Sequence, residues 1–138
     1  MKNWIYYGIF FSDTTKAAIL NYTKKTLSNI GYNIPDDWKV YCDHVTLLFN
    51  DKSEEKQKEA EGLNLFLGDQ ASMRVISIGI SGRAIALEVD YITQNKHSHV
   101  TVAIAPEAKP VESNDITSWI PVEDSFYITG TYKVVGRN

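Results

Sequence analysis

The sequence lacks the features that stabilise or target secreted and membrane proteins. Its one cysteine, Cys42, cannot form an internal disulfide, which is typical of a reducing compartment. No stretch approaches the roughly 18 uncharged apolar residues that cross a membrane. The opening Met1-Lys2-Asn3-Trp4 carries no long small-residue apolar run, so we expect no signal peptide. These absences predict a cytoplasmic protein that does not bind membranes.

The chain also has no excess of basic residues. Its 14 lysines and arginines are outnumbered by 17 aspartates and glutamates, which gives a net charge of −3. Coating a long nucleic acid requires many cationic contacts to phosphates. The charge balance therefore argues against a long nucleic acid as partner, while a small phosphate-bearing ligand remains compatible with it.

No shift in composition, low-complexity segment or short repeat divides the 138 residues, so we expect a single domain over 1–138. The order strand–helix–strand–helix, followed mostly by strands, predicts an α+β protein with largely antiparallel sheets. A loop over 106–124 holds three of the four prolines and, we expect, a short turn of helix near 115–119. The expected strands are 4–11, 39–49, about 71–81, 84–91, 98–105 and 125–135, and the expected helices are 13–30 and about 54–66.

Two of the three histidines stand in near-copies of one tetrapeptide. Residues 44–47 read His-Val-Thr-Leu and residues 99–102 read His-Val-Thr-Val. Two of three histidines acquire a threonine two residues later by chance on the order of once in a hundred. Side chains alternate along a strand, so in each copy the histidine and threonine share one face and the valine points into the core. The four residues on these shared faces are His44, Thr46, His99 and Thr101.

An imidazole and a hydroxyl on each of two strands suit the cleavage of a phosphodiester. The reaction needs a base for the nucleophile and an acid for the leaving oxygen, and the unperturbed pKa of histidine fits both roles at neutral pH. Threonine hydroxyls can donate hydrogen bonds to the phosphoryl oxygens, which carry charge in the transition state. Two such pairs around one phosphorus make a complete site without a metal or cofactor.

Paired His-x-Thr motifs on two strands, in a small chain that opens with a strand and a helix, resemble the 2H phosphoesterase superfamily. Its members include RNA 2′,3′-cyclic phosphodiesterases, bacterial RNA ligase-like proteins and phage nucleases that destroy the cyclic oligonucleotide signals of CBASS immunity. The resemblance implies a two-lobed fold around a central cleft, with one motif from each lobe. It also implies that His44 and His99 are the catalytic acid and base, in either order, and that Thr46 and Thr101 bind phosphate.

Within the superfamily, the short, acidic, aromatic-rich chain is most similar to the phage anti-CBASS group, and the stretch 106–114 resembles a ligand-facing loop. This implies a metal-independent phosphodiesterase that cleaves cyclic di- or oligonucleotides in viral immune evasion, located in the host cytoplasm if viral. The nucleophile, water or a ribose 2′-hydroxyl, and the oligomeric state stay open. Two alternatives are an RNA 2′,3′-cyclic phosphodiesterase that processes RNA ends and a sponge that binds a cyclic nucleotide without cleaving it.

Aromatic side chains are the candidates for holding a nucleobase, because base stacking contributes roughly 1–3 kcal/mol per base. We expect Tyr7, beside the small Gly8, and Trp119 to fill this role, although core packing is the common fate of either ring.

Other interpretations of the histidines and the cysteine also stay open. His44, His97 and His99 are sufficient in number for a zinc site. Cys42, placed by strand alternation on the face of His44, is either a nucleophile or a small buried hydrophobe. Both motifs can also be ordinary strand sequence with histidines at a surface.

Overall fold

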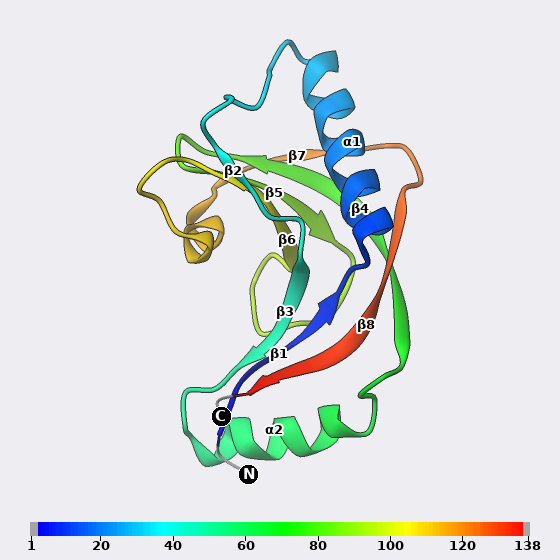
Figure 1. The fold of residues 1–138 in the computed structure, drawn as a ribbon, viewed down its shortest axis with the longest axis vertical. Coiled ribbons are helices and arrows are strands. Elements are labelled where there is room, and N and C mark those ends of the chain that lie inside the picture. Colours follow the sequence, from blue (N-terminus) through cyan, green and yellow to red (C-terminus); the bar gives the residue numbers. More distant parts are fainter. Residues whose placement is uncertain (1–2, 137–138) are drawn as a thin grey trace.

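The computed structural model describes residues 3–136 as a strongly curled antiparallel sheet with two helices against it (Figure 1). Met1 and Lys2, which bear on the expected absence of a signal peptide, lie outside the described residues. No helix within 3–136 is long and apolar enough to cross a membrane. The elements are β1 (Trp4–Phe10), α1 (Asp13–Asn29), β2 (Lys39–Val40), β3 (His44–Phe49), α2 (Glu54–Asn64), β4 (Gln70–Ile80), β5 (Ala84–Val89), β6 (His99–Ile104), the 3₁₀ helix η1 (Pro110–Asp115), β7 (Ser118–Pro121) and β8 (Tyr127–Gly136).

The long strand β4 joins two lobes. Its first half, Gln70–Arg74, pairs with β8, which continues through β1 to β3. Its second half pairs with β5 and β7, and β5 continues through β6 to β2. β3 and β6 meet between the lobes, so the strands close into a ring, and every pairing is antiparallel. The expected α+β architecture with largely antiparallel sheets is confirmed, and each lobe carries one His-Val-Thr motif.

Local sequence explains where the two helices begin and where α1 ends. Ser12 and Ser53 are the N-caps, and their hydroxyls accept hydrogen bonds from the amides of Thr15 and Lys56 at 3.2 Å each. Beyond α1, Gly31 adopts a φ of 75°, a left-handed conformation that favours glycine. Figure 1 shows α1 beside β4 and β8, and α2 at the opposite end of the molecule.

The main core fills the inside of the curled sheet. Ile19 and Leu27 of α1 are fully buried there, as are the two motif valines, Val45 and Val100. A smaller apolar cluster lies on the other face of β5 and β6, where Ile116 of the segment after η1 covers it. Each motif strand is therefore anchored by its valine, and its histidine and threonine are left on the opposite face.

Two predicted elements differ from the structure. The expected strand 39–49 is divided into β2 and β3, because Cys42 adopts a φ of 56° that breaks the ladder. The expected helical turn near 115–119 is wrong, since η1 precedes it and residues 118–121 form β7 against β4. Pro110 begins η1, in keeping with the preference of proline for a first helical turn.

Alanine substitutions at two glycines are expected to change stability in opposite directions and so test the packing. A Cβ on Gly130 of β8 would lie 2.7 Å from the carbonyl oxygen of Phe10, whereas a Cβ on Gly62 of α2 meets nothing within 4 Å. We expect Gly130→Ala to lower the free energy of unfolding by about 1–3 kcal/mol through overpacking. Gly62→Ala should raise it by about 0.5–1 kcal/mol through helix propensity. Urea denaturation measures both, and equal stabilities of the two variants would contradict this packing.

Candidate active site

The two motifs meet where β3 pairs with β6. Val45 lies opposite Val100, and both valines are fully buried. In an antiparallel pair with this register, the residue before one valine lies beside the residue after the other. The histidine of each motif is thus adjacent to the threonine of the other, around a local two-fold axis. All four polar side chains line one cavity of about 610 Å³: His44, Thr46, His99 and Thr101.

Hydrogen bonds fix the hydroxyls of this site. Nε2 of His44 lies 3.1 Å from Oγ1 of Thr46, so the imidazole and hydroxyl of the first motif are in direct contact. Oγ1 of Thr101 lies 2.9 Å from Oγ of Ser113, which is fully buried in η1. The 3₁₀ helix therefore positions the second threonine, a contact that the strand motif alone does not reveal.

A backbone carbonyl determines the tautomer of His99. Nδ1 of His99 lies 2.8 Å from the carbonyl oxygen of His97. A carbonyl only accepts, so Nδ1 carries the proton in the neutral ring and Nε2 keeps the lone pair. His97 is itself held, because its Nδ1 lies 2.9 Å from a carboxylate oxygen of Glu88. The arrangement leaves Nε2 of His99 as the nitrogen that can accept a proton.

Burial lowers the pKa of both imidazoles. For His44 desolvation is the largest cause and the proximity of His99 lowers the pKa further, while the charge of Asp43 opposes both. For His99 desolvation again dominates, and the hydrogen bond to His97 and the charge of Glu88 oppose it. A lowered pKa favours the neutral ring at pH 7. An anionic phosphate between the rings acts in the opposite direction, because it stabilises the charged imidazolium.

Aromatic rings of β1 and β3 form one wall of the cavity. His44 lies against Tyr6 and Phe10, with ring centroids 5.0 and 4.9 Å away. Tyr6 and Phe49 line the cavity with nearly parallel rings, 4° apart at 6.3 Å. Gly8 lies between Tyr6 and Phe10 in β1, and a Cβ there would come within 3.0 Å of the carbonyl oxygen of Val45. The missing side chain lets β1 approach the motif strand closely.

The expectation that Tyr7 stacks on a nucleobase is wrong. Tyr7 is 1% exposed, packs edge-on against Trp4 and donates a hydrogen bond from its hydroxyl to Asn64 at 2.5 Å. A register shift between Trp4 and Tyr6 turns Trp4 to the core side as well. The cavity-facing ring is that of the neighbouring Tyr6, because alternation places it with Gly8 and Phe10 on the side of His44.

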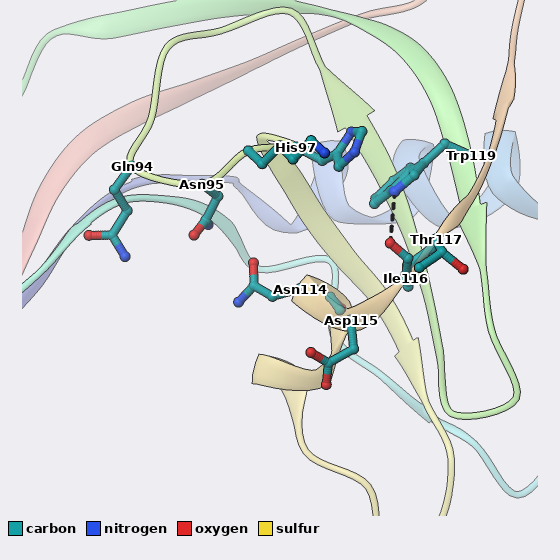
Figure 2. A pocket seen from close by; sticks show the side chains of 10 residues that line it. Gln94, Asn95, His97, Asn114, Asp115, Ile116, Thr117 and Trp119 are labelled. Carbon is teal, nitrogen blue, oxygen red and sulfur yellow. Dashed lines mark hydrogen bonds between the residues drawn. The ribbon is translucent and has the colours of Figure 1, made fainter.

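Trp119 lies beside the site rather than in its cavity. Its ring stacks on His97 at 4.8 Å and lies 6.5 Å from His99. It lines a second cavity next to the first, which is drawn in Figure 2. Its predicted role in base stacking is not decided by this placement.

The charges around the cavity are few and acidic. Asp43 and Asp51 line it, and within residues 3–136 no lysine or arginine does. Lys16 of α1 forms an ion pair with Asp43, with 3.1 Å between Nζ and the carboxylate oxygen. Arg83 forms an ion pair with Glu112 and does not line the cavity. The polar groups that the described lining offers to an anion are therefore hydroxyls, imidazoles and amides.

The structure also bears on the alternatives for cysteine and metal. Cys42 is 1% exposed in the core, away from the face of His44, and burial raises the pKa of its thiol to about 12. A nucleophilic role for Cys42 is therefore wrong. In the described part of the chain, no group of three histidine, cysteine or acidic side chains is placed to hold a metal ion, so the open alternative of a zinc site at His44, His97 and His99 is not supported.

Several residues of the site were missed by reasoning from sequence. Tyr6 and Phe49 could have been found from the strand alternation that links them to the histidine face. Pro110, Val111 and Asn114 also line the cavity, from within the stretch expected to be a ligand-facing loop. Nothing in their local pattern indicates that η1 lies against β6.

Comparisons with known proteins place the chain in a family. Residues 23–135 match the family described as the fungal tRNA ligase phosphodiesterase domain, which covers most of the chain and both motifs. A solved structure, TT0787 of Thermus thermophilus, is similar at 15% sequence identity with a TM-score of 0.47, over 95% of this chain and 94% of that one. No curated protein sequence matches. The chain belongs to the family of the fungal tRNA ligase phosphodiesterase domain and is a phosphodiesterase of the 2H type.

Proposed function

We propose that the cavity hydrolyses a nucleoside 2′,3′-cyclic phosphate, with His44 and His99 as the acid–base pair and Thr46 and Thr101 as phosphate ligands. The observation that carries the proposal is the two-fold arrangement of the motifs around one cavity. A phosphorus on this axis has an imidazole and a hydroxyl on each side. The chain belongs to the family of the fungal tRNA ligase phosphodiesterase domain, and this membership supports an RNA-derived substrate.

The reaction needs one proton removed and one proton supplied. One imidazole takes a proton from water as the water oxygen forms a bond to phosphorus, and the other donates its proton to the ribose oxygen as the P–O bond breaks. The product is a 2′- or 3′-phosphomonoester. The hydrogen bond from Nδ1 of His99 to a carbonyl keeps Nε2 free to accept a proton, which favours His99 as the base and His44 as the acid. The hydroxyls of Thr46 and Thr101 donate to the phosphoryl oxygens.

A cyclic di- or oligonucleotide is the second candidate substrate, as expected from the resemblance to anti-CBASS nucleases. Two observations favour it. The cavity has no lysine or arginine among its described lining residues, so a long polyanion gains little there. The parallel rings of Tyr6 and Phe49 offer flat surfaces to the bases of a compact ligand. Destroying such a signal would serve viral immune evasion, and the same four side chains would perform the cleavage.

Single substitutions test the four side chains. We expect His44→Ala and His99→Ala each to lower kcat by roughly 10²–10⁴, because each removes one proton transfer. Thr46→Val and Thr101→Val should lower kcat/KM by roughly 10–100-fold, since each removes a hydrogen bond to a charged group. Steady-state kinetics on 2′,3′-cyclic AMP measures these effects. Thr129→Val is the matched control, because Thr129 is an exposed strand threonine that does not line the cavity. Full activity of both histidine variants would overturn the mechanism.

The lowered imidazole pKa values predict an acidic optimum. The active free enzyme has one neutral and one charged imidazole, a form that is most abundant midway between two pKa values that both lie below 6.5. We expect kcat/KM to follow a bell centred below pH 6.5, and kcat to peak at higher pH because the bound phosphate raises both pKa values. Rates measured at constant ionic strength across pH 4.5–9 report both profiles. A flat profile, or an optimum of kcat/KM above pH 7, contradicts the pairing.

A nucleotide panel separates the two candidate substrates. The pure protein is incubated in EDTA with 2′,3′-cyclic AMP, cyclic dinucleotides and cyclic trinucleotides, and the products are resolved by chromatography. We expect 2′,3′-cyclic AMP to be opened without added metal. Cleavage of the cyclic oligonucleotides alone would favour the second candidate, and tight binding with no cleavage of any nucleotide would favour a sponge.

A further inference from the structure

A second cavity of about 590 Å³ adjoins the catalytic one. It is nearly as large, and Gln94, Asn95 and Asn114 line both. These three amides come from the connection between β5 and β6 and from η1, and Figure 2 shows Asn95 and Asn114 on facing segments. The two cavities are therefore neighbouring parts of one larger depression, divided by a rim of amide side chains.

Two hydrogen bonds join residues of the second cavity to His99 and Thr101 of the catalytic cavity. His97, which lines the second cavity, lies two residues before His99 and accepts its hydrogen bond. Ser113, also in the second cavity, bonds to the hydroxyl of Thr101 at 2.9 Å. A ligand that extends from the catalytic cavity past His99 and Thr101 would enter this second cavity.

Rigid rings form one side of the second cavity. The indole of Trp119 lies against Gly79, where a Cβ would come within 2.5 Å of the ring, and its N–H donates to the carbonyl of Ile116 at 3.1 Å. His97 stacks on this indole at an angle of 21° (Figure 2), and a carboxylate oxygen of Glu88 lies 2.9 Å from its Nδ1. Both rings are fixed before any ligand arrives, which lowers the entropic cost of binding.

The remaining lining suits a nucleoside and its phosphate. Asparagine and glutamine amides can pair with the donor and acceptor edges of a base, and fixed rings suit stacking. Lys96 is the only lysine or arginine, among the described residues, that lines either cavity. Its placement in the second cavity provides a cation for a phosphate other than the one that reacts.

We propose that the second cavity is a subsite for the nucleoside that precedes the terminal one, so that the preferred substrate contains at least two nucleotides. The inference rests on the proposed cleavage at His44 and His99 and specifies its substrate class. A dinucleotide that ends in a 2′,3′-cyclic phosphate places its terminal nucleotide in the catalytic cavity and its preceding nucleoside in the second.

The test compares kcat/KM for a dinucleotide 2′,3′-cyclic phosphate with kcat/KM for the mononucleotide. We expect a ratio of about ten in the wild-type protein, as one stacked and hydrogen-bonded base provides. Thr117→Trp, which fills the second cavity from an exposed position, should reduce the ratio to about one, and Lys96→Ala, which removes only the cation, should reduce it part of the way. Thr14→Trp and Lys58→Ala are the matched controls, because these exposed residues line neither cavity, and they should keep the ratio near ten.

The outcomes separate the inference from the proposed function. A wild-type ratio near one, with both substrates cleaved, overturns the subsite and leaves the proposed function intact. Equal losses on both substrates in Thr117→Trp and Lys96→Ala also overturn it, because they indicate a general disturbance of the fold. If neither substrate is cleaved, the proposed function fails and the subsite fails with it.

Discussion

The site depends on one backbone pairing, that of Val45 with Val100 between the two lobes. Both valines are fully buried, so a shift of either strand by one residue would expose its valine and bury its histidine and threonine. The hydrophobic core thereby holds the polar residues in register. Because the two motifs are near-copies, the same pairing gives the site an imidazole and a hydroxyl from each strand.

The imidazoles of the cavity are largely desolvated, and no lysine or arginine is among the described residues that line it. Desolvation lowers the pKa of His44 and of His99, and no described lysine or arginine lines the cavity to attract an anion. An anionic substrate therefore brings the charge that favours protonation of an imidazole. Within the cavity, neutral hydrogen bonds and ring contacts then contribute more than lining cations to holding that substrate.

Strand alternation located the motifs well and the aromatic residues poorly. It placed the histidines and threonines on one face and their valines in the core, as the structure has them. It did not say which face of β1 meets the cavity: Tyr7 lies on the core face and Tyr6 on the cavity face, and an irregular register turns Trp4 into the core as well. Cys42 left the face of His44 because its positive φ breaks the strand. Such local irregularities arise from tertiary packing, which periodicity does not encode.

The sequence by itself determined the chemistry on offer and the elements that present it. Two His-Val-Thr units, the N-capping serines of both helices and the alternating apolar residues follow from local physical rules. Only the tertiary structure decided that the two units lie side by side on paired strands and line one cavity. It also decided that η1 supports Thr101 through Ser113 and that a second cavity adjoins the first. These features depend on contacts between different elements, and their geometry is set by strand pairing and core packing, to which local sequence contributes only the pattern.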